Sequence, residues 1–127
     1  MKDVSYELIK KGLDVSSLRQ RMISSNIANF NTPDYKVNRV AFEEILAKAT
    51  KEITLKKTHD KHFGIDTIED IKPEVKKRNT TSLNDNGNNV DIDIEMTELA
   101  ANEIYYSVLV RQASSKLSNL NYVINRT

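Results

Sequence analysis

The most regular hydrophobic pattern in the chain lies in its C-terminal third. Apolar residues recur there at alternating steps of three and four positions, the heptad a/d spacing of a helix that packs against another helix. The series covers about four heptads and is interrupted only at Glu103. Its members are Met96, Leu99, Tyr106, Val110, Ala113, Leu117, Leu120 and Ile124. The pattern predicts a helix over residues 93–127 with this seam as its packing face.

Other apolar residues lie beside this seam. Ile104, Tyr105, Val108 and Leu109 widen the stripe, so we expect the helix to have apolar contacts on more than one side. At about 1.5 Å per residue the helix would be roughly 50 Å long.

The N-terminal segment carries a second amphipathic pattern, which predicts a helix from about Lys2 to Ala28. Gly12 is a weak point inside it. One stripe consists of Val4, Leu8, Val15, Leu18 and Met22, and a second of Ile9, Leu13, Ile23 and Ile27. Two apolar stripes on one helix require two packing partners. Either the two terminal helices form a self-sufficient hairpin, or the outer stripes of the hairpin pack against other subunits.

The middle of the chain, residues 31–92, has a different character. We expect a short helix around residues 42–48, a short strand in KEITLKKT (51–58), and then polar loop with room for a β-hairpin. NDNGNN reads as a turn because Asn and Gly tolerate positive φ. Asp91 or Asp93 is predicted to cap the last helix.

These elements predict a mainly α fold. Long N- and C-terminal helices pair as an antiparallel coiled-coil hairpin, with a small loop or β-hairpin segment between them. The terminal helical domain comprises residues 1–30 with 93–127, and the middle segment, 31–92, is expected to be partly flexible before assembly.

Composition narrows the class of protein. The formal net charge is +1, without the basic excess that is typical of a nucleic-acid-binding protein. Only 6% of residues are aromatic and none is Trp, so the core should be thin. The absence of Cys excludes disulfides and thiol chemistry. We also find no apolar run long enough for a membrane span and no recognisable signal peptide.

One segment, THDKH, could hold a metal ion. His59 and His62 flank Asp60 and would share one face of a helix, but a catalytic site needs further ligands that the sequence does not supply. No HExxH, GxSxG or phosphate-binding glycine motif is present. We therefore assign no catalytic, cofactor-binding or metal-binding residue and expect no cofactor. A small metal-dependent enzyme remains an alternative.

The stretch SSNIANFNTPDYK ends the first helix. Pro33 disfavours helical geometry at Thr32, and the following Asp34 suits a turn position with positive φ. Asn26, Asn29 and Asn31 carry amides that can satisfy the carbonyls of the helix end or bond a neighbouring backbone.

This stretch resembles the motif of the flagellar axial proteins, the rod, hook and hook-associated subunits, in which an asparagine-rich N-x-x-N-x-N-T-P-G-Y segment ends the first helix. Asp34 replaces the glycine of the motif. The matching residues are Asn26, Ala28, Asn29, Asn31, Thr32, Pro33 and Tyr35.

Two further segments are similar to proximal rod subunits of this family. KTHDKHFGI is similar to the segment after their short strand, and NGNNVDIDIEM resembles the D-G-N-N-V-D-x-x-x-E-M segment that opens their last helix. The Asp before the glycine of that segment is displaced here to Asp85 by an extra asparagine. The chain length also suits a proximal rod subunit without large inserted domains.

The resemblance implies a structural role in the bacterial flagellum and no enzymatic activity. Such subunits leave the cytoplasm through the flagellar type III export apparatus without a cleaved signal. They polymerise in the cell envelope, in the periplasmic space, into the rod of the basal body. Expected partners are other rod subunits (FlgC-like and distal), the adaptor FliE, the membrane ring and the export apparatus. A cytoplasmic helical-hairpin adaptor or export chaperone remains an alternative.

Overall fold

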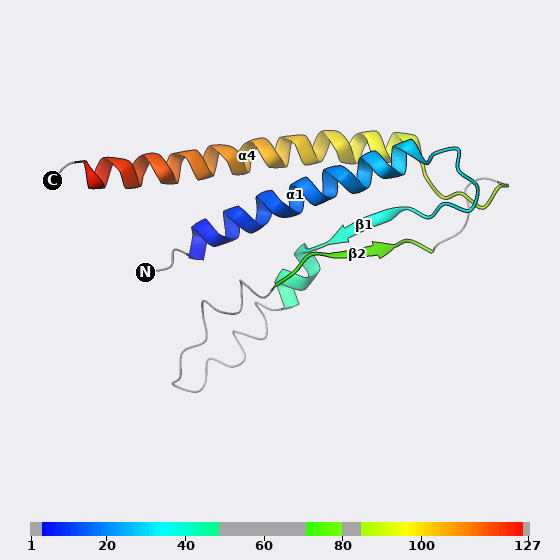
Figure 1. The fold of residues 1–127 in the computed structure, drawn as a ribbon, viewed down its shortest axis with the longest axis horizontal. Coiled ribbons are helices and arrows are strands. Elements are labelled where there is room, and N and C mark those ends of the chain that lie inside the picture. Colours follow the sequence, from blue (N-terminus) through cyan, green and yellow to red (C-terminus); the bar gives the residue numbers. More distant parts are fainter. Residues whose placement is uncertain (1–3, 49–70, 80–84, 126–127) are drawn as a thin grey trace, which may run out of the picture.

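The fold consists of two long helices and a small sheet. The computed structural model describes residues 4–48, 71–79 and 85–125. Helix α1 (Val4–Ala28) and helix α4 (Ile92–Ile124) lie side by side and run in opposite directions (Figure 1). Strands β1 (Asn38–Ala41) and β2 (Glu74–Lys77) form an antiparallel pair. The predicted mainly α fold with paired terminal helices is confirmed.

The middle segment follows the prediction only in part. The short helix expected around residues 42–48 is present over residues 43–48. Neither strand of the sheet was identified in the sequence, because each has four residues and β2 is exposed throughout, so neither shows a clear alternation. The strand predicted at 51–58 lies outside the described residues, as do His59, Asp60 and His62.

One face of α1 packs on the sheet and the short helix. Buried Val15 of α1 belongs to a hydrophobic cluster with Val40, Phe42 and Ile71. Leu18 and Met22, from the first predicted stripe of this helix, pack against that cluster together with Ile45 and Leu46. The second partner that the two stripes of α1 required is therefore the middle segment of the same chain.

An ion pair at the surface joins the short helix to α1. Nη2 of Arg19 lies 2.8 and 2.9 Å from the two carboxylate oxygens of Glu43. Partial burial by itself would raise the pKa of Glu43, but the hydrogen bonds and charge of Arg19 outweigh it and lower the pKa. Because the Glu43 side chain is 60% exposed, this pair contributes little to stability.

The opposite interface joins α1 to α4, and here the predicted seam is wrong. Six of its residues in α4 are 42–69% exposed, while Leu99 and Ala113 are half-buried. The buried residues of α4 are Glu95, Asn102 and Leu109, one position before the seam positions at each heptad. The prediction failed because two of these three contact residues are polar. The exposed seam residues are Met96, Tyr106, Val110, Leu117, Leu120 and Ile124. In α1, Leu8 of the first predicted stripe is also 38% exposed.

Gly12 of α1 lies against a buried side chain of α4. A Cβ atom at this position would lie 2.9 Å from Cδ1 of Leu109. The glycine that the sequence presents as a weak point in a helix is therefore a notch that receives a buried side chain of α4.

The helices also differ in length. Helix α4 has 33 residues and α1 has 25, so at about 1.5 Å per residue they span roughly 50 and 37 Å. The C-terminal end of α4 extends past Val4, the first described residue of α1 (Figure 1). Leu117, Leu120 and Ile124 lie in this end of α4 and are more than half exposed.

We predict that truncation of Phe42 detaches the middle segment from α1. Its side chain is 3% exposed at the centre of the cluster, so Phe42→Ala should lower the free energy of unfolding by about 3 kcal/mol. Urea denaturation followed by circular dichroism measures this loss. Val75→Ala is the matched control, because Val75 lies in the same sheet but is 43% exposed. Equal losses for the two variants would contradict the assignment of this core.

Candidate assembly site at the end of the first helix

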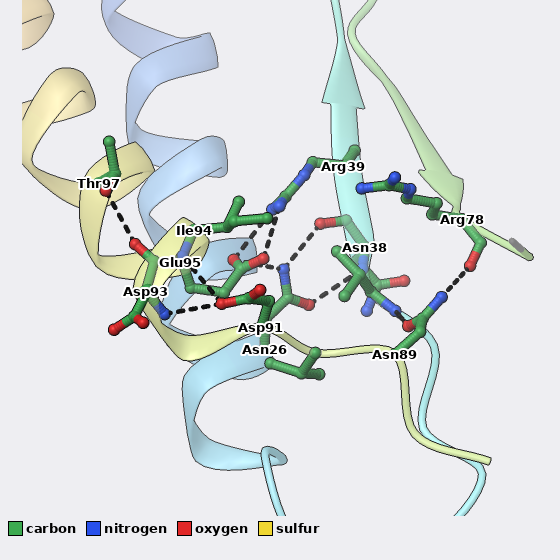
Figure 2. A network of polar contacts seen from close by, with 12 residues as sticks. Asn26, Asn38, Arg39, Arg78, Asn89, Asp91, Asp93, Ile94, Glu95 and Thr97 are labelled. Carbon is green, nitrogen blue, oxygen red and sulfur yellow. Dashed lines mark hydrogen bonds and ion pairs between the residues drawn. The ribbon is translucent and has the colours of Figure 1, made fainter. Parts of the chain in front are cut away.

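Four segments converge where α1 ends. They are the last turns of α1, strand β1, the loop over residues 86–90 and the first turn of α4 (Figure 2). The side chains that join them are mostly amides, together with one carboxylate and one guanidinium. Several of these side chains are buried, so their hydrogen bonds determine how the four segments sit on one another.

Asn26 lies at the centre of this convergence and is 0% exposed. Its amide pairs with the backbone of Asn38 in β1: the side-chain oxygen accepts from N of Asn38 at 3.0 Å, and Nδ2 donates to its carbonyl oxygen at 3.0 Å. This is the hydrogen-bond pattern that a neighbouring strand would offer. Asn26 therefore takes the place of a third strand at the edge of the small sheet and holds β1 against α1.

The same amide reaches α4. Nδ2 of Asn26 also donates to Oε2 of Glu95 at 3.0 Å. Arg39 of β1 donates to both carboxylate oxygens of Glu95, at 2.9 and 2.5 Å (Figure 2). Glu95 is 1% exposed, and a buried carboxylate is tolerable only when charge and hydrogen bonds compensate its lost hydration. This partnership could not be predicted from sequence patterns because its members lie 13 to 69 positions apart.

Asn89 fills a place in the sheet ladder. Its oxygen accepts from N of Val37 at 2.8 Å, and its Nδ2 donates to the carbonyl oxygen of Arg78 at 2.6 Å. Beside it, N of Arg78 donates to the carbonyl oxygen of Val37 at 2.9 Å. The amide thus bridges the residue before β1 and the residue after β2, and it connects both strands to the loop before α4.

Asn88 binds the turn that directly follows α1. Its Nδ2 lies 2.7 to 2.9 Å from three carbonyl oxygens, those of Asn29, Phe30 and Thr32. Its oxygen accepts from N of Val90 at 2.7 Å. These carbonyl groups belong to the turn that directly follows α1, so Asn88 fixes the path of the chain as it leaves the helix. In the sequence, the NGNN segment indicates a turn and resembles a family segment, but its hydrogen bonds to the turn after α1 are not apparent.

The Thr-Pro-Asp-Tyr turn adopts the geometry that was predicted for it. Asp34 has φ 57°, and its N donates to the carbonyl oxygen of Asn86 at 3.0 Å. Gly87, with φ 79°, lies so close that a Cβ there would be 2.2 Å from Oδ1 of Asp34. Two chain reversals, one after α1 and one before α4, therefore pack against each other, and the second requires glycine.

The motif residues divide into an inner and an outer group. Asn26 is buried, and the Tyr35 hydroxyl lies 3.2 Å from both Oδ1 of Asn26 and Oγ of Ser25. Asn29 is half-buried; its amide donates to the carbonyl oxygen of Ser25 at 2.8 Å and accepts from the Thr32 hydroxyl at 3.1 Å. The outer group is exposed and consists of Ala28, Asn31, Thr32, Pro33 and Asp34.

A second polar layer joins the helices further from the turn. Oγ of Ser16 donates to Oδ1 of Asn102 at 3.0 Å, and Nδ2 of Asn102 donates to the carbonyl oxygen of Ser16 at 3.0 Å and to Oε1 of Gln20 at 2.9 Å. Ser16 is 1% exposed and Asn102 is 4% exposed. Neither was predicted to be a contact residue, since sequence patterns identify helix faces through apolar side chains.

The start of α4 agrees with the prediction. Asp91 is the N-cap, and its Oδ1 accepts from N of Asp93 at 3.0 Å and from N of Ile94 at 3.2 Å. Asp93 and Glu95 occupy the first turn, where the positive end of the helix dipole stabilises their negative charge.

The polar side chains at this site are bonded to one another and to the backbone. Among the described residues, every buried side-chain nitrogen or oxygen has a hydrogen-bond partner. Within the same ranges, no group of three or more His, Asp or Glu side chains could hold a metal ion. The residues that meet here position helices and strands.

Comparison with known proteins agrees with the resemblance seen in the sequence. A family model described as flagella basal body rod protein matches residues 12–36, which include the end of α1 and the turn. The flagellar basal body rod protein FlgB of Bacillus subtilis is 35% identical over 91% of this chain and 89% of its own length. The chain belongs to the FlgB family of flagellar basal-body rod proteins.

Further FlgB proteins match over nearly the same extent. The FlgB protein of Borreliella burgdorferi is 36% identical over 94% of this chain and 95% of its own length. That of Escherichia coli is 26% identical over 96% and 94%. These proteins are structural components of the rod. Membership of the FlgB family therefore agrees with the expectation that the chain is not an enzyme. It supports neither a small metal-dependent enzyme nor a cytoplasmic adaptor or export chaperone. Within the described residues, no helix is long and apolar enough to cross a membrane.

We predict that Asn88 matters more for folding than the exposed asparagine of the motif. Asn88→Ala removes a buried donor that three carbonyl groups share and should lower the free energy of unfolding by about 1–3 kcal/mol. Asn31→Ala should change it by less than about 0.5 kcal/mol, because Asn31 is exposed. Urea titration of both variants measures the difference. A loss for Asn31→Ala as large as that for Asn88→Ala would contradict the assigned roles.

Proposed function

We propose that this chain is a structural subunit of the proximal rod of the bacterial flagellum, polymerised into the drive shaft of the basal body. Its membership of the FlgB family supports the role in the rod. The observation that supports polymerisation most directly is the exposed apolar surface of α4, because the large apolar surfaces that soluble monomers leave uncovered are commonly interaction sites.

This surface has two sides. One carries the seam residues Met96, Tyr106, Val110 and Leu117, which are 42–52% exposed. The other carries Ile104 and Val108, which are 66% and 44% exposed and point about 120° or more away from Asn102 in a helix of 3.6 residues per turn. With α1 on a third side, α4 has the pattern of a helix surrounded by other helices. Contacts of this kind that do not close into a ring generate a helical assembly.

We further propose the partners and route that the resemblance implies. The neighbours would be other copies of the chain, FlgC-like and distal rod subunits, the adaptor FliE and the membrane ring. Export through the flagellar type III apparatus, without a cleaved signal, would bring the subunit into the periplasmic part of the envelope. A chain without Cys and with a small core suits export in an unfolded state.

The two-part division of the chain stays part of this proposal. Residues 1–30 with 93–127 would form the inner helical domain, and residues 31–92 the outer segment. The cluster around Asn26 and Glu95 would then set the direction in which the outer segment leaves the helices.

The exposed part of the motif offers a direct test of assembly. Because Asn29 is bonded within the chain and Asn31 is exposed, Asn31→Ala should leave folding and export intact and reduce swimming several-fold through a lost contact with a neighbour. Complementation of a strain that lacks its rod subunit measures swimming, and export is followed by immunoblotting. Asn119→Ala, an exposed asparagine in α4, is the matched control. Wild-type swimming of the Asn31→Ala strain would contradict a contact at this residue.

A charge in the exposed seam tests the apolar surface of α4. Leu117 is 51% exposed, so Leu117→Asp should leave the free energy of unfolding within about 1 kcal/mol of the parent but prevent incorporation into rods. Purified basal bodies probed for the subunit give the readout, with Asn119→Asp as the control for added charge. Normal incorporation of the Leu117→Asp subunit would exclude this surface from assembly.

A further inference from the structure

Helix α4 offers α1 more than one face, and the face that is used is not the more apolar one. Met96 and Val110 remain 52% and 42% exposed, whereas Glu95 and Asn102 are buried against α1. A rotation of α4 by one residue, about 100°, would bring Met96, Glu103 and Val110 to the places of Glu95, Asn102 and Leu109. The contact would then bury two apolar side chains of α4 instead of one. Hydrophobic burial alone would therefore favour a different packing of the two helices.

The surface that α1 presents to α4 is itself partly polar. Ser16 is 1% exposed and Asn26 is 0% exposed, and both are bonded across the interface. Ser16 meets Asn102 at 3.0 Å, and Asn26 meets Glu95 at 3.0 Å. The two partners on α4 lie one heptad apart, and Leu109 follows after another heptad.

Leu109 provides a steric counterpart to these polar contacts. It is 9% exposed and lies at the Gly12 notch, where a Cβ would come within 2.9 Å of its Cδ1. Glu95, Asn102 and Leu109 thus form one line along α4, and each has a specific counterpart in α1.

We infer that these two polar layers, together with the notch at Gly12, select which face of α4 packs on α1. After a one-residue rotation, Ser16 would lose its hydrogen bond to Asn102 and Asn26 would lose its hydrogen bond to Glu95, which penalises the alternative packing. Polar residues inside a helical seam are known to specify pairing in this way, at some cost in stability. The selection keeps the apolar series of Met96 and Val110 out of the intramolecular contact. Only this last consequence, a surface left free for neighbours, rests on the proposed function.

Thiol labelling of the full chain tests the inference, because the chain contains no native cysteine. Single cysteines are introduced as Leu109→Cys or Val110→Cys, and their rates of reaction with a maleimide are compared. In the parent background, the cysteine at 110 should react at least about tenfold faster than the cysteine at 109, since residue 109 faces α1.

The decisive variant moves the buried amide by one position. Asn102→Leu combined with Glu103→Asn offers Ser16 its partner on the adjacent face, so the ratio of the two rates should invert. Asn102→Ala removes the layer without replacing it, and the ratio should fall to within about threefold. Asn119→Leu is the matched control, because it makes the same kind of change at an exposed position of α4 and should keep the parent ratio.

Circular dichroism of each chain shows that the helices are retained. The inference is overturned if the double variant Asn102→Leu with Glu103→Asn retains its helices and keeps the parent ratio of labelling rates. It is also overturned if Asn102→Ala keeps that ratio. Should the double variant lose helix content, the Asn102→Ala ratio decides alone. None of these rates depends on rod assembly, so failure here and failure of the proposed function are distinguishable.

Discussion

The fold depends on one buried carboxylate, that of Glu95. It is held by the guanidinium of Arg39 from the sheet and by the amide of Asn26 from the first helix. Because an isolated buried charge would be costly, helix α4, helix α1 and strand β1 must come together in a single arrangement that satisfies it. Asn26 couples this site to the sheet, since its amide also pairs with the backbone of Asn38.

The loop before α4 stabilises this arrangement from the other side. Asn88 donates to carbonyl groups of the turn that follows α1, and Asn89 bridges the residue before β1 and the residue after β2. Together with Asn26, these residues place three amides at the points where regular hydrogen bonding stops. An amide carries both a donor and an acceptor, so each can replace a stretch of missing backbone. These contacts define how the middle segment leaves the helices without a large hydrophobic core in the described residues.

Away from this junction, much apolar surface of the described residues remains exposed. The buried cluster around Val15, Phe42 and Ile71 is small, and most of the exposed large apolar residues lie on α4. The structure thus combines a polar junction of defined geometry with a helix that has more apolar surface than the described part of the chain covers. This combination suits a subunit whose stability increases when neighbours bind.

Local sequence was sufficient to determine the two long helices, the cap at Asp91 and the positive φ of Asp34, because period, capping and turn chemistry act within a few residues. It also identified Asn26 and Tyr35 through the flagellar motif. Only the tertiary structure decided which face of α4 meets α1, that Gly12 is a notch, and that Asn88, Asn89 and Glu95 hold the junction together. The physical reason is that polar groups reveal their role only through partners, and here those partners lie as many as 86 positions away along the chain.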